Sequence, residues 1–446
     1  MTEGRPIRLI MGIALPLMLG NVFQQLYTVV DASVVGQGVG MEALAALGAS
    51  DWFNWMFLSI AQGLAQGFAI PMAHAFGAKD YDGLRKNVGN AAVLAVVTSA
   101  IITVAALLLI RPVLALLGTP EDIRPMSTAY LTVLFAGLPV VMAYNLLAGV
   151  LRSLGDGRSP LYAMIVASLV NIALDVLFVV GFGWGVASAA AATVIAQGCS
   201  CLFCVYRLKG VEVMRLKRSD LKPDPRLCGR LLRLGVPISA QNAIISVGGM
   251  IVQSVVNPLG VAFIAGYTAT NKLYGVLEIA AVSYGYAMST YAGQNLGARK
   301  IDRIRRGVRS GALAGVLTAA GIAAAMFLFG RQIVSLFIDS GAENAADAVR
   351  IAVEYLRVMS AALPVLYILH VYRSALQGMG NTVMPMVSGL AEFVMRTGSA
   401  MLLPGLVGYW GVFYAEILAW AGADLILVPS YLSTFARLKK RFGEGA

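Results

Sequence analysis

The chain has 446 residues, of which 58% are hydrophobic and 13% charged, and its formal net charge is +11. Soluble globular domains carry about 25% charged residues, so this composition excludes an ordinary soluble protein. Apolar runs of about twenty residues, long enough to cross ~30 Å of hydrocarbon as helices, recur along the whole chain. Together these features predict an all-α, polytopic membrane protein.

Twelve membrane spans are predicted, at approximately residues 7–35, 50–75, 88–110, 125–150, 161–182, 185–206, 232–257, 265–292, 308–330, 350–374, 385–403 and 409–435. The amino terminus, the loops that share its side of the membrane and the carboxyl-terminal tail hold 27 of the 34 Lys and Arg residues. This bias predicts that both termini are cytoplasmic, and it explains the basic charge without a nucleic-acid partner. The first apolar run lacks the short core and cleavage site of a separate signal peptide.

The first predicted span contains a carboxylate, Asp31, in an apolar run that has no other charged residue after Arg8. A carboxylate inside a membrane is costly and normally faces a cavity or a partner. Pro16 lies in the same span, where it removes a backbone hydrogen bond and is expected to kink the helix.

The fifth predicted span adds Asn171 and Asp175, which are four residues apart and therefore share one face of a helix. The first half of the chain thus places two carboxylates in the membrane, with no obvious Lys or Arg near them. A cation can serve as the missing partner, or a proton can, because burial disfavours the charged form of a carboxyl group. The alternative is a purely structural acid pair.

The four cysteines do not form a zinc motif. Cys199, Cys201 and Cys204 lie in the apolar run CSCLFC at the end of a span, and Cys228 lies in the following loop. Structural zinc takes four ligands in a compact site, so we expect the cysteines to fill helix surfaces. The two histidines, His74 and His370, are expected to be helix-end or interhelical residues and not metal ligands.

The two halves of the chain repeat each other. LPLMLGN, with Pro16, returns 221 residues later as VPISAQN, with Pro237. LRSLGDGRSP, with Pro160, is likewise echoed by LQGMGNTVMP, with Pro385. Six spans in each half bring both halves into the membrane from the same side, as in parallel-repeat transporters. We therefore predict an N-lobe at 1–206 that carries the ion site, a basic cytoplasmic linker at 207–233 and a C-lobe at 234–446.

The repeat is not symmetric in its charges. By the repeat spacing, Asn171 corresponds to Arg396, whereas Asp31 and Asp175 correspond to apolar positions. Glu392 lies one helical turn before Arg396 and is expected to neutralise it. Glu278, in the eighth span, is a candidate second coupling or substrate-binding acid. A structural role is equally open for the remaining charged residues of these spans, Lys272, Glu416 and Asp424, and for Glu278 itself.

The stretch LPLMLGNVFQQLYTVVDASVVGQGVGMEALAALGAS, together with GAKDYDGLRKNV and LRSLGDGRSP, resembles the multidrug and toxic compound extrusion (MATE) family. The resemblance extends over essentially the whole chain. It implies twelve transmembrane helices in two six-helix bundles related by pseudo-two-fold symmetry, with a V-shaped central cavity. It also implies export of organic cations in exchange for sodium or protons. The seventh predicted span lacks the acid that one branch carries there, so the chain looks closer to the prokaryotic DinF-like branch.

The resemblance assigns roles to individual side chains. The residues that match the family's coupling-ion site, for sodium or a proton, are Asp31, Asn171, Asp175, Thr193, Tyr27 and Asn145. Pro16 matches the proline at which the first helix of the family bends. The candidates for the substrate cavity are Gln24, Trp52, Trp55, Met56, Tyr284, Met288 and Glu278. Aromatic and methionine side chains suit flat organic cations, although they are equally usual at membrane interfaces and between helices.

These inferences predict a secondary active efflux transporter in the cytoplasmic membrane of a prokaryote, acting as a monomer and using no cofactor other than its coupling ion. The rival within the same superfamily is an exporter or flippase of lipid-linked oligosaccharides or metabolites, which usually has a cationic cavity where this chain has an anionic site. A membrane enzyme would need a catalytic set of side chains, and no such spacing is evident in the sequence. A receptor or scaffold would not require an intramembrane acid pair.

Overall fold

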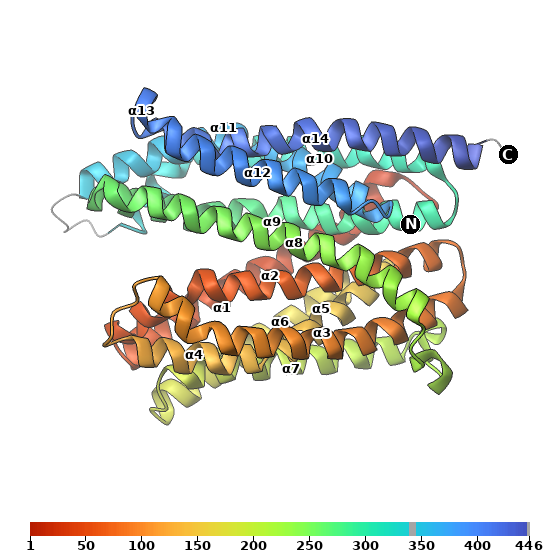
Figure 1. The fold of residues 1–446 in the computed structure, drawn as a ribbon, viewed down its shortest axis with the longest axis horizontal. Coiled ribbons are helices and arrows are strands. Elements are labelled where there is room, and N and C mark those ends of the chain that lie inside the picture. Colours follow the sequence, from red (N-terminus) through yellow and green to blue (C-terminus); the bar gives the residue numbers. More distant parts are fainter. Residues whose placement is uncertain (339–344, 444–446) are drawn as a thin grey trace. The chain divides into compact units, whose positions relative to one another are not determined.

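The structure, a computed structural model, describes residues 1–338 and 345–443, and within those ranges it contains helices and no strand (Figure 1). Its helices are α1 (Pro6–Gly38), α2 (Met41–Gly77), α3 (Tyr81–Leu116), α4 (Arg124–Ala136), α5 (Leu138–Ser153), α6 (Arg158–Asp175), α7 (Val186–Lys209), α8 (Pro225–Val256), α9 (Val261–Gly297), α10 (Ile301–Ser335), α11 (Ala345–Gly378), α12 (Val383–Leu402), α13 (Pro404–Val407) and α14 (Trp410–Gly443). Four short elements join some of them: the π-helix η1 (Val176–Gly181) and the 3₁₀ turns η2 (Glu212–Met214), η3 (Arg218–Leu221) and η4 (Asn257–Leu259).

Each predicted span coincides with one helix or with two consecutive ones. The fourth span is divided into α4 and α5, which meet at a 44° bend, because Pro139 in the first turn of α5 removes a backbone donor after Gly137. Ten of the described helices are long and apolar enough to cross a membrane, or eleven if α4 and α5 form one span. α9 is not among them, because Lys272, Glu278 and several Thr, Asn and Tyr residues lower its hydropathy. The prediction of an all-α polytopic membrane protein is confirmed.

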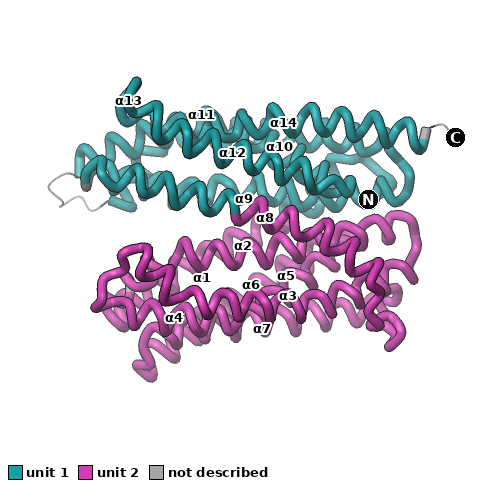
Figure 2. The backbone as a smooth tube through the Cα atoms, in the orientation of Figure 1, with its two compact units in different colours: residues 1–15, 244–446 teal, residues 16–243 magenta. Residues whose placement is uncertain are grey.

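The chain divides into two compact units (Figure 2). Unit 2 comprises Pro16–Ala243, and unit 1 comprises Met1–Leu15 and Ile244–Ala446. These units differ from the predicted lobes in two places. The start of α1 belongs to the unit formed by the second half of the chain, and residues 207–243, which include the start of α8, belong to the unit formed by the first half. Both divisions fall inside a continuous helix, near the two prolines that the sequence repeat pairs, Pro16 and Pro237. Each half thus contributes the beginning of its first helix to the other unit.

The start of α8 packs closely on α2 inside unit 2. Gly67 of α2 lies directly against the backbone of Gly235 in α8. Small residues at such points allow two helix backbones to approach each other. Next to this contact, the hydroxyl of Ser239 donates a hydrogen bond to the carbonyl oxygen of Ile60 at 2.8 Å. The beginning of α8 is therefore an integral part of unit 2.

The start of α1 is fastened in a corresponding way to unit 1. The guanidinium of Arg303, in the first turn of α10, donates hydrogen bonds to the carbonyl oxygens of Met1 at 3.3 Å and Gly4 at 3.1 Å. The ammonium of Lys300, just before α10, donates to the carbonyl oxygen of Thr2 at 3.0 Å. These bonds hold the segment that leads into α1 on the turn between α9 and α10.

The core of unit 1 is built on stacked aromatic rings. Tyr355 of α11 stacks on Tyr267 of α9 with ring centroids 5.2 Å apart, and on Phe413 of α14 at 4.7 Å. Phe263 extends the stack beyond Phe413 at 5.7 Å. Such pairs contribute about 0.5–1.5 kcal/mol each beyond the burial of their area. They connect three helices of unit 1, α9, α11 and α14.

Replacing Gly67 by alanine tests the close approach of α2 and α8. A Cβ atom at position 67 would overlap the backbone of Gly235, and overpacking of this kind costs about 1–3 kcal/mol. We expect Gly67→Ala to lower the thermal unfolding temperature of the purified protein in detergent. Gly198→Ala, in α7, is the matched control, because a Cβ atom there meets nothing within 4 Å and alanine is the better helix former. Equal unfolding temperatures for the two variants would contradict the packing described.

Candidate coupling-ion site

Asp31 and Asp175 come together inside unit 2. Asp31 lies on α1 and Asp175 is the last residue of α6, and their exposed fractions are 8% and 0%. Their carboxyl groups are close enough for a direct hydrogen bond when one of them carries a proton. No Lys or Arg side chain in the described residues forms an ion pair with either acid. Two like charges therefore meet without a compensating base.

Four oxygen atoms around this pair are buried and have no hydrogen-bond donor in the part of the chain that the structure describes. They are Oδ1 of Asp31, Oδ1 and Oδ2 of Asp175, and Oδ1 of Asn171. Asn171 is held by its other amide atom, since Nδ2 donates to Oγ1 of Thr193 on α7 at 3.3 Å. Buried acceptors without donors are unfavourable. The partner that this set of oxygens lacks is a cation or a proton.

The oxygens around the acid pair are ligands of the kind that hard cations prefer. No group of three or more His, Cys, Asp and Glu side chains among the described residues could hold a metal ion. The cluster has instead two carboxylates and the amide carbonyl of Asn171. The hydroxyl of Thr193 lies behind them, where it accepts a hydrogen bond from the amide nitrogen of Asn171. Oxygen ligands of this kind suit hard cations.

Asp175 lies where α6 changes into the π-helix η1. The six residues of η1 form a wider helix that follows directly after the acid. π-Turns inside helices are rare and are frequent at functional sites. The apolar run VLFVVG contains no sequence signal for this turn, so sequence analysis missed it. Its effect is to end the regular hydrogen bonding of α6 at the carboxylate.

Tyrosines complete the surroundings of the acids. Tyr27, one turn before Asp31, forms a side-chain hydrogen bond with Gln24 and lies within electrostatic range of both carboxylates. Tyr130 of α4 is buried and lies within electrostatic range of the same two acids. Sequence analysis did not single out Tyr130, because a tyrosine in a long apolar helix is ordinary and only its position in space identifies it.

Asn145, also predicted for this site, makes its hydrogen bond to its own helix. Its amide nitrogen donates to the carbonyl oxygen of Val141 in α5 at 2.9 Å. The structure brings together Asp31, Asp175, Asn171 and Thr193, with Tyr27 and Gln24 beside them, and the role of Asn145 stays a prediction.

The predicted substrate residues of unit 2 form an exposed aromatic surface. Trp52 and Trp55 of α2 are both exposed and meet edge to face, with ring centroids 6.3 Å apart. Met56, next to them, is partly buried and packs against the hydrophobic core of the unit. The two indoles can thus receive an apolar or cationic molecule or contact lipid.

Tyr284 and Met288, also predicted for the substrate cavity, are buried in this structure. Their exposed fractions are 1% and 0%. The hydroxyl of Tyr284 hydrogen-bonds with Oγ1 of Thr318 on α10 at 2.9 Å, and the methyl group of Met288 fills the space beside Gly311. Both side chains serve packing between α9 and α10, a face that the sequence pattern alone could not distinguish.

Glu278 has a protein partner. Its carboxylate lies 3.3 Å from Nε2 of His370, which places the histidine between α9 and α11 as expected. The side chain of Glu278 is one-third exposed and that of His370 is largely buried. Lys272, six residues earlier, is exposed.

The other buried charges of unit 1 form one network. Glu392 and Arg396 of α12 pair at 3.0 Å, which confirms the sequence prediction. Arg373 of α11 binds the second oxygen of Glu392 at 2.6 Å, and Glu416 of α14 binds Arg396 at 2.9 Å. The network contains two positive and two negative groups, so its charges cancel within the protein. Asp424 of α14 lies within electrostatic range of Arg373 and Glu392, and one of its carboxylate oxygens is buried without a donor among the described residues.

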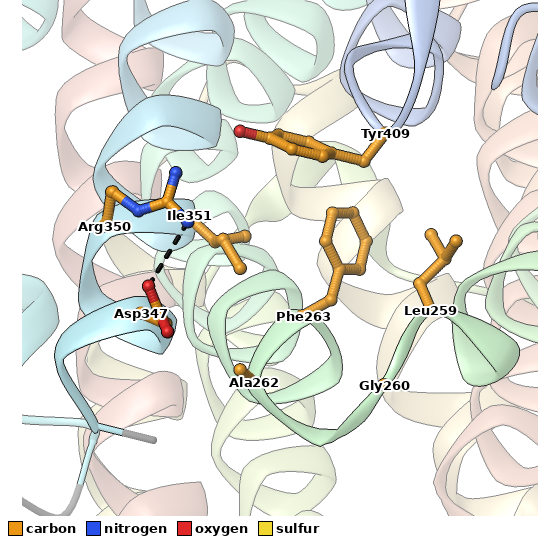
Figure 3. Close-up of a pocket in the computed structure, with 8 residues that line it drawn as sticks. All are labelled: Leu259, Gly260, Ala262, Phe263, Asp347, Arg350, Ile351 and Tyr409. Atoms are coloured by element: carbon orange, nitrogen blue, oxygen red, sulfur yellow. Dashed lines mark hydrogen bonds and ion pairs between the residues drawn. The ribbon is translucent and has the colours of Figure 1, made fainter.

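Unit 1 also has a surface pocket of about 490 Å³, formed by residues at the beginnings of α9, α11 and α14 (Figure 3). Its polar side chains are occupied with one another. Arg350 lies 3.3 Å from Asp347 and 3.5 Å from Glu354, and the hydroxyl of Tyr409 donates to Glu354 at 2.9 Å. The ring of Phe263 closes the apolar side of the pocket. Nothing in this closed arrangement calls for an ion, in contrast to the acid pair of unit 2.

Comparison with known proteins agrees with the repeat and the fold. A family model described as MatE matches residues 16–177 and 237–401. The "Probable multidrug resistance protein YoeA" of Bacillus subtilis is 31% identical over 331 residues, which cover 72% of each chain. The "Probable multidrug resistance protein YpnP" of the same species is 28% identical and covers 92% of this chain and 91% of its own. A solved MOP superfamily transporter from Pyrococcus furiosus has a TM-score of 0.92 at 24% identity, covers 98% of both chains and shares the fold.

Removing the arginine at the centre of the unit 1 network should destabilise the protein. Arg396→Met leaves Glu392 and Glu416 buried without their shared base, and breaking a buried pair costs about 3–5 kcal/mol. We expect a marked fall in the denaturation midpoint in detergent, partly restored by adding Glu416→Gln. Arg350→Met is the matched control, since that arginine also pairs with two acids but is 55% exposed, and surface pairs contribute about 0–1 kcal/mol. Similar losses in both variants would contradict a special role for burial.

Proposed function

The chain belongs to the MatE family, and on this premise we propose that it is an efflux transporter that exports small organic cations in exchange for sodium ions or protons. The observation that carries the proposal is the buried acid pair of Asp31 and Asp175, which has no basic partner among the described residues. Such a pair is costly inside a membrane unless something neutralises it. A neutralising group that can leave again is what a coupling site requires.

The same carboxylates can serve either ion. A proton shared between Asp31 and Asp175 removes one of the two charges. A sodium ion finds hard oxygen ligands in both carboxylates and in the carbonyl of Asn171. Thr193 favours a sodium ion, because its hydroxyl accepts a hydrogen bond from the amide nitrogen of Asn171 and leaves the carbonyl oxygen of Asn171 available.

Coupling follows if ion binding and substrate binding favour different states of one equilibrium. α1 is the element suited to link them, because it carries Asp31 in unit 2 and begins in unit 1. Pro16 is the first residue of the part of α1 that belongs to unit 2. The backbone donor that proline lacks makes a helix easier to bend at this point. An ion held between α1 and α6 would favour one shape of α1, and its release would favour another.

The energy available matches this scheme. The membrane potential supplies about 2.3 kcal/mol per elementary charge per 100 mV, so it contributes when two ions enter for each monovalent cation exported. A one-for-one exchange moves no net charge and is driven by the concentration gradient of the ion. The excess of Lys and Arg on one side supports an orientation with both termini in the cytoplasm. That orientation is the one expected for a multi-pass protein of a prokaryotic plasma membrane.

Cationic substrates are favoured by the charge of the site and by its surroundings. The acid pair is anionic when empty, and the exposed indoles of Trp52 and Trp55 offer faces for cation–π contacts on the same unit. The two Bacillus subtilis relatives are described as probable multidrug resistance proteins. We propose the same class of cargo here, carried by a monomer that needs no cofactor beyond its coupling ion.

The decisive experiment measures gradient-driven transport in proteoliposomes. Uptake of a fluorescent organic cation would be followed with a sodium gradient alone and with a pH gradient alone. We expect Asp31→Asn and Asp175→Asn each to reduce the driven flux by about tenfold or more, since an interaction with a charged group is worth about 1.5–3 kcal/mol. The gradient that drives the wild-type protein identifies the ion.

Glu42→Gln is the matched control for these variants. Glu42 is an exposed acid in the first turn of α2 and lies outside the cluster, so its loss should leave the flux unchanged. Full transport by Asp31→Asn would remove that residue from the mechanism. No transport of any cation under either gradient would point instead to an exporter of anionic metabolites or lipid-linked oligosaccharides.

A second experiment separates the hinge from the ion site. Pro16→Ala restores a backbone donor in α1, so we expect it to slow transport severalfold while the affinity of the purified protein for the coupling ion stays the same. Pro237→Ala is the control at the corresponding place in α8, where Val252 stands at the repeat position of Asp31. A loss of ion affinity in Pro16→Ala, or an equal slowing by Pro237→Ala, would contradict a dedicated hinge in α1.

A further inference from the structure

The segment that joins α7 to α8 has features that ion coupling does not explain. Residues 210–224 contain η2 and η3 and connect two helices that are long and apolar enough to cross the membrane. The segment therefore leaves the bilayer and returns to it within a few residues, and it stays close to the membrane surface. We use the name linker segment for residues 215–226, which comprise η3, the residues around it and the beginning of α8.

The linker segment is fixed on α3. Asp220 is buried, and its carboxylate accepts a hydrogen bond from the backbone N–H of Lys217 at 2.8 Å and lies 3.8 Å from Nε of Arg85. Asn90 of α3 accepts a hydrogen bond from the backbone N–H of Asp224 at 2.7 Å. These contacts hold the segment in one conformation, so its exposed side chains have a defined arrangement.

The exposed charge of the linker segment is predominantly basic. Of its two acids, Asp220 is buried beside Arg85, and Asp224, which is exposed, accepts hydrogen bonds from the backbone N–H groups of Arg226 and Leu227 in the first turn of α8. Five basic side chains are exposed and form no ion pair within the part of the chain that the structure describes: Arg215, Lys217, Arg218, Lys222 and Arg226.

Two leucines interrupt this basic surface. Leu216 and Leu221 are 44% and 45% exposed, although residues on both sides of them are charged or buried in contacts with α3. Exposure of apolar side chains to water is unfavourable in free energy. Apolar residues among lysines and arginines are typical of segments that lie in the interfacial region of a membrane, with the leucines toward the acyl chains and the basic groups at the phosphates.

We propose that the linker segment binds the headgroups of anionic phospholipids in the leaflet from which α7 and α8 enter the membrane. Uncompensated Arg and Lys side chains attract anionic lipids, and guanidinium groups match phosphate geometry. The exposed leucines and the closeness to two spans favour a lipid surface over a soluble polyanion. Because the segment is fixed on α3, lipid binding anchors this end of unit 2 at the bilayer surface. The proposal does not depend on which ion or substrate is transported.

A depth measurement tests this directly. Nitroxide labels would be attached to Leu216→Cys or Leu221→Cys in a full-length chain whose four native cysteines are replaced by serine. The protein would be reconstituted in vesicles of phosphatidylcholine alone or of phosphatidylcholine and phosphatidylglycerol in equal parts. Collisions of the label with oxygen, which enters the membrane, and with a water-soluble nickel complex would be compared. We expect the anionic lipid to reduce contact with the nickel complex severalfold.

Charge removal provides the control. Lys217→Gln, Arg218→Gln and Lys222→Gln combined should abolish the effect of phosphatidylglycerol on the label at position 221 or 216. The same loss of three charges at the exposed end of α14, through Lys439→Gln, Lys440→Gln and Arg441→Gln, should leave it intact. A label that remains in contact with the nickel complex in both vesicles would overturn the proposal. Protection by added heparin but not by phosphatidylglycerol would also overturn it and assign the surface to a soluble polyanion.

Discussion

A pair of carboxylates buried without a base is the constraint around which unit 2 is organised. In unit 1 the corresponding problem is solved inside the protein, because Arg396 occupies the repeat position of Asn171 and binds Glu392 and Glu416. The two units thus share a repeated sequence pattern, but their buried charged groups differ in net charge. A network whose charges cancel has no use for an ion, whereas Asp31 and Asp175 have no basic partner among the described residues, which is why we propose that an ion or a proton binds there. This difference is the physical ground for assigning the exchangeable charge to unit 2.

Much of this arrangement was predictable from the sequence. Twelve apolar stretches predicted the helices, because a hydrocarbon environment forces backbone groups to pair within each segment. Asp31 and Asp175 stood out because a carboxylate is conspicuous in such a stretch. The pairing of Glu392 with Arg396 followed from helical spacing alone. These predictions share one property, which is that the relevant signal lies within a single helix.

The features that sequence reasoning missed depend on contacts between helices. Arg373 and Glu416 join the unit 1 network from α11 and α14, and no spacing in the chain relates them to Glu392 or Arg396. Tyr130 approaches the acids from α4, and Tyr284 is buried because Thr318 of α10 faces it. The π-turn after Asp175 has an unremarkable apolar sequence. Such features are set by which faces of neighbouring helices meet, and hydrophobicity alone does not encode that choice when most faces are apolar.

The distribution of packing explains why α1 is the helix suited to respond to an ion. Beyond Pro16, five large apolar side chains of α1 are exposed, Leu19, Val22, Phe23, Leu26 and Val29, while Asp31 is buried. Exposed side chains lose few protein contacts when a helix bends, whereas the aromatic stack of unit 1 would lose its contacts. This part of α1 is therefore held mainly near its end, where Val35 packs into the core of unit 2 and Asp31 lies beside Asp175. In the proposed mechanism, an ion that binds or leaves at Asp31 acts on a helix whose middle part carries exposed apolar side chains and makes few packing contacts of its own.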